Sequence, residues 1–185
     1  MRITGGRARG RILMTPKGYN IRPTSDRVRE AIFNIIGQDL SGLRVLDLFS
    51  GTGGLGIEAL SRGAFPALFV DCSPDAVRLV EENLARCGFR DVGAVIRWDL
   101  NRGLPVRHPF MRDPAHLVFL DPPYGQGVLV PLLGKLSPGR VLEKGARVVA
   151  ETRKTETLPG VVGKMERVLT RTYGDTRISV YETAQ

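Results

Sequence analysis

The segment VLDLFSGTGGLGIEAL at residues 45–60 constrains the fold more than any other part of the chain. It begins with an apolar run typical of a buried strand, passes through four closely spaced glycines and ends in a helical pattern. A strand that turns through a glycine-rich loop into a helix is the first half of a βαβ unit. The segment therefore predicts a parallel sheet, in which ligands bind beyond the carboxyl ends of the strands.

Strand and helix patterns alternate along most of the chain. Strands are predicted at residues 44–49, 67–71, 94–98, 117–120 and 146–151. Helices are predicted at 25–36, from the glycine loop to about residue 63, at 74–87 and at 128–136. The chain ends in a predicted antiparallel hairpin with strands at 167–173 and 177–182 and a turn at Gly174-Asp175. We therefore expect an α/β fold with a mainly parallel, seven-stranded sheet and an antiparallel C-terminal hairpin.

Polar caps and glycines mark the ends of two of these helices. Thr24 is a candidate N-cap for the first helix, and Gly37 follows its last apolar residue. For the helix at 74–87, Ser73 is a candidate N-cap because proline at the next position suits the first helical turn. Gly88 is its candidate C-terminal cap. These signals fix both helices in the sequence.

Positive charge is concentrated at the N-terminus. The formal net charge is +8, and residues 1–30 hold eight Lys or Arg side chains against two acids. Residues 1–13 are predicted to form a short basic hairpin with glycines in its turn, followed by an irregular segment at 16–23. Such a patch suits a polyanion, and a solvated basic face is the alternative interpretation. We expect a basic extension at 1–23 and a main domain at 24–185.

Cysteines and apolar runs limit the class of protein. Cys72 and Cys87 stand alone, without the spacing of a metal site or of a disulfide framework. The first residues lack the apolar core of a signal peptide, and the chain has no apolar run of membrane-spanning length. We therefore expect a cytoplasmic protein that binds neither a metal nor a membrane.

Carboxylates stand at the ends of the first three predicted strands. Asp47 precedes Gly51, Gly53 and Gly56, which complete a GxGxxG pattern that is a weak signal by itself. With this acid late in the strand, the pattern resembles class I methyltransferases, which implies a Rossmann-like fold with S-adenosylmethionine as cofactor. Asp71, at the end of the second strand, suits both hydroxyls of a ribose.

The same resemblance implies further contacts with the cofactor. Asp99, after the third strand, would accept a hydrogen bond from the adenine amine. The complete set of expected cofactor-binding residues is Asp47, Phe49, Gly51, Gly53, Asp71, Cys72, Asp99, Leu100 and Asp121. For the individual aspartates, a helix cap at Asp71 and a solvated loop residue at Asp99 are the structural alternatives.

The tetrad Asp121-Pro122-Pro123-Tyr124 directly follows the apolar strand at 117–120. It resembles the (D/N)PPY motif of methyltransferases that act on amines. The Asp121 carboxylate and the Pro122 carbonyl can each accept one hydrogen of an exocyclic base amine, whose lone pair is otherwise delocalised into the ring. Tyr124 offers a face on which an unstacked base can lie. The expected catalytic residues are Asp121, Pro122 and Tyr124.

The segments RITGGRARGRIL at 2–13 and RPTSDRVREAIFNII at 22–36 narrow the resemblance. With the motifs above, nearly the whole chain resembles the RsmD family, bacterial enzymes that methylate guanine N2 in 16S ribosomal RNA. The resemblance implies a monomer that acts on this RNA, within the small ribosomal subunit or an assembly intermediate. It also implies that four residues help to close the cofactor and RNA end of the site: Thr24, Asp26, Arg27 and Glu30. Charge compensation at the start of a helix is the alternative for the two acids. Related enzymes often carry the longer glutamate at the place of Asp71, so the ribose contact is expected to differ in detail.

The same resemblance directs the N-terminal arginines toward phosphate. The expected RNA-binding residues are Arg2, Arg7, Arg9, Arg11, Arg22, Arg27 and Arg29. A solvated helix face is the alternative for the last two.

Two other functions remain open from the sequence. A DNA adenine-N6 methyltransferase uses the same amine chemistry and also needs a basic surface, but a chain of 185 residues leaves little room for a DNA-recognition domain. A non-catalytic RNA-binding assembly factor would keep the fold without turnover, but the intact glycine loop and the intact tetrad argue against it.

Overall fold

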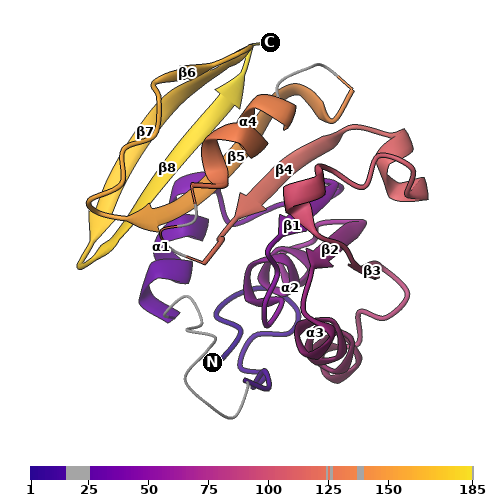
Figure 1. The fold of residues 1–185 in the computed structure, drawn as a ribbon. Coiled ribbons are helices and arrows are strands. Elements are labelled where there is room, and N and C mark those ends of the chain that lie inside the picture. Colours follow the sequence, from indigo (N-terminus) through magenta and orange to yellow (C-terminus); the bar gives the residue numbers. More distant parts are fainter. Residues whose placement is uncertain (16–25, 124, 126, 137–139, 185) are drawn as a thin grey trace. The chain divides into compact units, whose positions relative to one another are not determined.

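The computed structural model describes residues 1–15, 26–123, 125, 127–136 and 140–184. The chain divides into two compact units, Met1–Trp98 and Asp99–Gln185. Figure 1 shows their helices and strands. The predicted N-cap Thr24, the irregular segment at 16–23 and the predicted boundary between residues 23 and 24 lie outside the described residues.

The first unit is a three-stranded parallel sheet with helices between its strands (Figure 1). Its elements are α1 (Asp26–Ile36), β1 (Val45–Leu48), α2 (Gly54–Ser61), β2 (Ala67–Asp71), α3 (Pro74–Cys87) and β3 (Gly93–Arg97). The strand order is β3-β2-β1, and every residue of β1 is buried, as are the first four of β2. This burial on both faces explains why both strands are almost continuously apolar.

The second unit joins a parallel strand pair to an antiparallel hairpin. Its elements are the 3₁₀ helices η1 (Leu100–Arg102) and η2 (Pro109–Arg112), the helix α4 (Leu129–Leu136) and the strands β4 (Ala115–Leu120), β5 (Leu142–Arg153), β6 (Val161–Val162), β7 (Met165–Tyr173) and β8 (Thr176–Thr183). The strand order is β4-β5-β8-β7-β6. β4 and β5 are parallel, and the remaining pairs are antiparallel.

The predicted elements are present, with small differences in extent. Ser73 accepts a hydrogen bond from the Ala76 amide and Gly88 adopts the left-handed conformation, which confirms both caps of α3. The described residues hold eight strands where seven were predicted, because the two-residue β6 pairs with the start of β7. β5 is also longer than predicted. Its first half carries charged residues that conceal the strand pattern, and its second half pairs with β8.

The N-terminal segment, residues 1–15, belongs to the first unit and packs on α2 and α3. The predicted hairpin is a loop closed by one antiparallel bridge between Arg2 and Ile12. Gly6 has a φ of 73° and lies so close to α2 that a Cβ would be 1.8 Å from the Ser61 carbonyl oxygen. Only glycine fits this contact.

A buried ion cluster holds the segment against α2. Glu58 is 0% exposed and accepts hydrogen bonds from the Thr4 amide at 2.9 Å and the Gly5 amide at 2.8 Å. It also forms ion pairs with Arg29 of α1 at 3.2 Å and with Arg62 at 2.8 Å. One carboxylate therefore joins the N-terminal segment to two helices of the same unit.

Asn83 of α3 holds the other end of the segment. Its side chain is fully buried, accepts a hydrogen bond from the Met14 amide at 2.7 Å and donates one to the Met14 carbonyl at 3.1 Å. It also donates to the Thr52 carbonyl in the glycine loop at 2.9 Å. One buried side chain thus forms hydrogen bonds with both the N-terminal segment and the glycine loop.

Among the described residues, no helix combines the length and the apolar character needed to cross a membrane.

Candidate functional site

The loop after β1 has a backbone shaped for close approach by a ligand. Phe49 has a φ of 64°, and Gly51 and Gly53 have φ values of 54° and 77°. Among the described residues Phe49 is the one non-glycine with a positive φ, a conformation that strains an L side chain. Strain of this kind gathers at binding sites, where the surrounding structure holds it in place.

Asp47 shapes this loop from inside the unit. Its side chain is almost fully buried, and its Oδ2 accepts a hydrogen bond from the Gly56 amide at 2.9 Å. A Cβ on Gly56 would lie 2.8 Å from that oxygen and 2.3 Å from Phe69. The predicted contact between Asp47 and a cofactor stays a prediction, and the structure gives this residue a role in fixing the loop.

Burial raises the pKa of Asp47 to about 8, while the Gly56 amide opposes the shift and the charge of Asp71 adds to it. Because the native state holds this proton more tightly than the unfolded state, stability from Asp47 is lost as the pH rises from about 4 to about 8. We expect Asp47→Asn, which keeps an acceptor for Gly56, to flatten that loss by on the order of 1 kcal/mol per pH unit. Urea unfolding at pH 5 and at pH 8 measures the difference. Equal pH slopes in the two proteins would refute this role.

Asp71 ends β2 beside the same loop. Its Oδ2 accepts a hydrogen bond from the Gly51 amide at 2.9 Å, and its Oδ1 accepts one from the Ser73 amide at 2.9 Å. A carboxylate has about four acceptor positions, so two remain for the hydroxyls of a ribose. The side chain is held in place and half-buried, which suits a ligand contact.

The loop also fits an S-adenosylmethionine ligand by its own polar groups. The Ser50 hydroxyl is buried and has no hydrogen-bond partner among the described residues. Such a group is costly unless something pairs with it. A buried hydroxyl, strained Phe49 and fixed Asp71 together make a polar, closely approachable loop.

The other expected cofactor residues differ in their surroundings. Cys72 is exposed, and its carbonyl accepts a hydrogen bond from Arg97 at 3.1 Å. Asp99 caps η1 through the Asn101 amide at 3.0 Å, and Leu100 is buried behind it. This cap differs from the solvated loop position that was the structural alternative for Asp99, and the side chain is still 44% exposed.

Asp121, the first residue of the predicted catalytic tetrad, directly follows β4 in the second unit. Asp121 is half-buried, Pro122 is buried and Pro123 is exposed, while Tyr124 lies outside the described residues. A cavity of about 190 Å³ adjoins the two prolines. The motif therefore opens onto a space at the carboxyl end of its strand, where ligands bind in parallel sheets.

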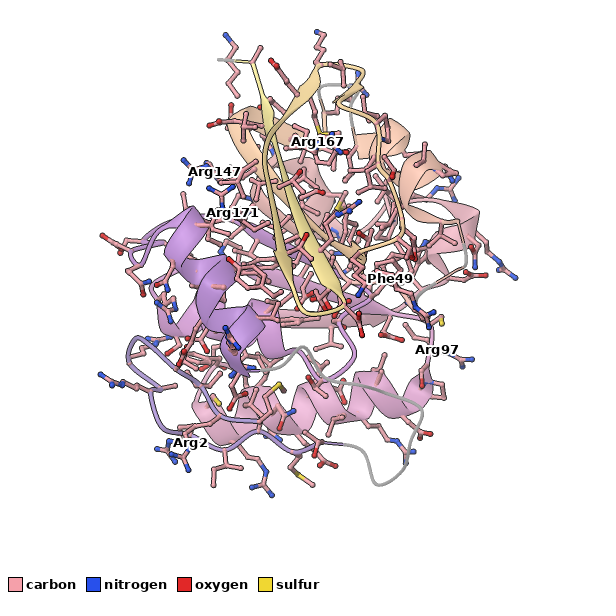
Figure 2. The ribbon with its side chains drawn as sticks, turned by 90° about the vertical axis from the view of Figure 1, so that its left-hand side faces the viewer. Arg2, Phe49, Arg97, Arg147, Arg167 and Arg171 are labelled. Carbon is pink, nitrogen blue, oxygen red and sulfur yellow. The ribbon has the colours of Figure 1, made fainter. Side chains whose placement is uncertain are left out.

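The expected RNA-binding arginines differ in their exposure to solvent. Arg2, Arg7, Arg9, Arg11 and Arg27 are exposed, whereas Arg22 lies outside the described residues. In Figure 2 the Arg2 side chain points away from the N-terminal segment. Arg29 is 0% exposed and paired with Glu58, so its expected contact with phosphate is wrong: the guanidinium balances a buried carboxylate instead.

Two of the exposed arginines border a hollow on the first unit. Arg2 and Arg9 line it together with Asp26 and Glu30, and its volume is about 540 Å³. Arg7 lies instead over the ring of Phe89, with 4.4 Å between its guanidinium carbon and the ring centroid. Further basic residues that the sequence did not single out, Arg147 and Arg171, are exposed on β5 and β7 (Figure 2). These arginines lie far apart in the sequence, so a count of basic residues in each segment does not reveal them.

The described residues contain no group of three or more His, Cys, Asp or Glu side chains placed to hold a metal ion.

Several known proteins are similar to this chain in sequence and in architecture. “Putative rRNA methyltransferase YlbH” of Bacillus subtilis (strain 168) is 40% identical over 185 residues, covering 98% of both chains. “Ribosomal RNA small subunit methyltransferase D” of Escherichia coli (strain K12) is 33% identical and covers 87% of this chain and 79% of its own length. A solved structure titled “Putative methyltransferase yhhF from Escherichia coli” superposes with a TM-score of 0.83 at 30% identity, covering 100% of this chain and 98% of that one.

Fold, loop and relatives together define an S-adenosylmethionine-dependent methyltransferase with the class I, Rossmann-like fold. A more distant structure of the same fold, an RNA methyltransferase from Salinibacter ruber, was solved with S-adenosyl-L-homocysteine (19% identity, TM-score 0.63, 89% of this chain and 95% of that one). The model of the family described as “Conserved hypothetical protein 95” matches residues 1–182. The chain belongs to that family, which confirms the resemblance to RsmD drawn from the sequence.

Proposed function

We propose that the protein transfers a methyl group from S-adenosylmethionine to the exocyclic N2 amine of a guanine in 16S ribosomal RNA. The observation that carries the proposal is an intact amine-acceptor tetrad beside a cavity, in a chain whose relatives are named as ribosomal RNA methyltransferases. The small ribosomal subunit, or an assembly intermediate of it, is the proposed form of the substrate, and a monomer is the proposed active form.

The chain's own residues account for binding of the cofactor. The loop at Phe49–Gly53 and the Asp71 carboxylate hold it, with Asp99 and Leu100 toward the adenine. When bound, S-adenosylmethionine supplies a methyl group whose bond to sulfur breaks as the bond to nitrogen forms, with the electron pair staying on sulfur. Asp71 serves through the acceptor positions that Gly51 and Ser73 leave unused.

Asp121 and Pro122 act on the amine. Each accepts one amine hydrogen, which makes the nitrogen more tetrahedral and turns its lone pair away from the ring. Tyr124 supplies a stacking face for the base, worth about 1–3 kcal/mol. After transfer the nitrogen carries an extra proton, which leaves to the Asp121 carboxylate or to water. Positioning of two bound reactants supplies most of the acceleration, since effective molarities of about 10⁵ M are available to oriented pairs.

The N-terminal segment provides the RNA contact in this proposal. The exposed guanidinium groups of Arg2, Arg9 and Arg11 lie on a segment that Glu58 and Asn83 hold rigidly against the unit. A rigid basic surface loses less conformational entropy on binding than a free tail does. RNA shape and this surface, rather than a separate domain, would then select the target.

We expect the double variant Arg9→Ala/Arg11→Ala to weaken RNA binding and to reduce the salt dependence of the binding constant. Removing two phosphate contacts lowers the slope of log K against log salt by about 1.4 for single-stranded RNA. Fluorescence anisotropy with a 16S fragment, at salt concentrations from about 50 to about 300 mM KCl, measures the slope. Arg78→Ala is the control, since that exposed arginine is already paired with Asp75 on α3. An unchanged slope in the double variant would remove these arginines from the RNA surface.

Transfer of labelled methyl groups tests the function itself. The protein is incubated with labelled S-adenosylmethionine and, separately, with naked 16S RNA, small subunits and duplex DNA, followed by mass spectrometry of the nucleosides. We expect N2-methylguanosine from the small subunit. N6-methyladenine in DNA would replace the proposal with the adenine-N6 alternative, and absence of label from all three would favour a binding factor.

A further inference from the structure

The cavity beside the acceptor motif has an unusual lining within the second unit. Its apolar walls come from Pro122, Pro123, Leu129 and Leu158, and two carboxylates, Glu151 and Glu156, also face the space. At about 190 Å³ it is smaller than the roughly 300–1,000 Å³ of pockets for drug-sized ligands. A space of this size with apolar walls and two acidic groups suits one base-sized ring system that carries hydrogen-bond donors.

The strand register brings one of these carboxylates beside Asp121. Leu120, the last residue of β4, pairs with Ala150 of β5 in the parallel ladder. Asp121, directly after β4, and Glu151 of β5 are therefore the residues that follow this pair. Pro122, the neighbour of Asp121, and Glu151 line the same cavity. Glu151 is only 6% exposed, and in such surroundings its charge acts more strongly than in water.

Ionised carboxylates only accept hydrogen bonds. Asp121 and Glu151 therefore favour a base that carries two donor groups on adjacent atoms. Guanine offers such a pair, the N1–H group and the N2 amine. Adenine places its amine beside the lone pair of N1, which a neighbouring carboxylate would repel. Asp121 and the Pro122 carbonyl already account for the amine hydrogens, which leaves the N1–H group for the second carboxylate.

We propose that Glu151 is the specificity-determining residue that accepts the N1–H hydrogen bond of the target guanine and thereby excludes adenine. This inference rests on the proposed function and deepens it by assigning base recognition to a named side chain. A site built to pair with a donor rejects an analogue without it far more strongly than an apolar pocket can, because a buried charge is left facing a lone pair.

The analogue 2-aminopurine separates this role from general damage to the enzyme. It keeps the amine at C2 but carries a lone pair at N1 in place of the N1–H group. The target nucleotide is first mapped with the unaltered protein, and the RNA is then prepared with guanine or 2-aminopurine at that single position. We expect the unaltered protein to prefer guanine by about 10–100-fold in kcat/KM, the range that a hydrogen bond to a charged group provides.

Glu151→Gln is the deciding variant, because its amide can accept from guanine or donate to the lone pair of 2-aminopurine. We expect the preference for guanine to fall by about 10-fold or more, while binding of S-adenosyl-L-homocysteine and the melting temperature stay unchanged. Glu143→Gln makes the same chemical change at the other end of β5 and should keep the preference.

The outcomes separate the inference from the proposed function. If the unaltered protein forms N2-methylguanosine and Glu151→Gln lowers transfer to both bases equally, the inference is wrong and the proposed function stands. If the unaltered protein forms no N2-methylguanosine on any RNA, both are wrong.

Discussion

Replacement of Asp121 by alanine is expected to lower kcat for methyl transfer by about 100-fold or more, while the dissociation constant for S-adenosyl-L-homocysteine changes by less than about 3-fold. The carboxylate accepts an amine hydrogen and stabilises the positive charge that grows on nitrogen, and alanine does neither. Single-turnover kinetics with labelled cofactor give the rate, and calorimetry gives the affinity.

Asp121→Asn is the matched control, because its amide oxygen still accepts one amine hydrogen. We expect this variant to retain more than about a tenth of the activity, as the (D/N) alternative in the motif implies. An alanine variant with full turnover would show that Asp121 takes no part in the reaction. Loss of cofactor affinity in proportion to activity would instead assign Asp121 to the cofactor site.

Glu58→Ala is expected to have the largest effect on stability, about 3–5 kcal/mol in the free energy of unfolding. The substitution leaves the buried guanidinium groups of Arg29 and Arg62 without their shared carboxylate and the amides of Thr4 and Gly5 without their acceptor. For a chain of this size the melting temperature should fall by roughly 6–20 °C. Thermal and urea unfolding measure both quantities.

Two further variants grade this effect. Thr4→Ala removes the hydrogen bond that its hydroxyl donates to Glu58 at 2.9 Å and the one that it accepts from Arg62 at 3.1 Å. The backbone contacts of Glu58 remain, so the variant should lower stability by about 1–2 kcal/mol. Asp75→Ala breaks an ion pair whose partners are both exposed and should change stability by less than about 1 kcal/mol. An equally small loss in Glu58→Ala would mean that the ion cluster contributes nothing net.

The sequence predicted the fold well because its signals are local. The caps of α3 and the turn at Gly174-Asp175 follow from the residues at those positions, and the structure confirms them. The glycine loop and the tetrad also occupy the ends of the strands predicted for them. Periodicity predicted only residues 146–151 of β5, because the charged residues in its first half conceal the strand pattern.

The buried polar residues were beyond that kind of reasoning. Arg29 was assigned to the RNA surface through the family resemblance and the concentration of arginines around it, whereas the position of Glu58 explains its burial. A signal did exist. Glu58 is the one charged residue in a helix that is apolar on all sides, and such a helix lies inside a protein. Asn83 follows Val80 at the spacing of the buried face of α3, so a polar partner for it could also have been sought.

The contacts of the N-terminal segment also set the order in which the chain can fold during synthesis. Thr4 and Gly5 bind Glu58, which lies 54 and 53 residues later in the chain. Met14 binds Asn83, which lies 69 residues later. At about 5–20 residues per second these residues remain without their partners for several seconds after they are made. The basic segment thus reaches its final contacts only after Glu58 and Asn83 have been made, although it precedes both in synthesis.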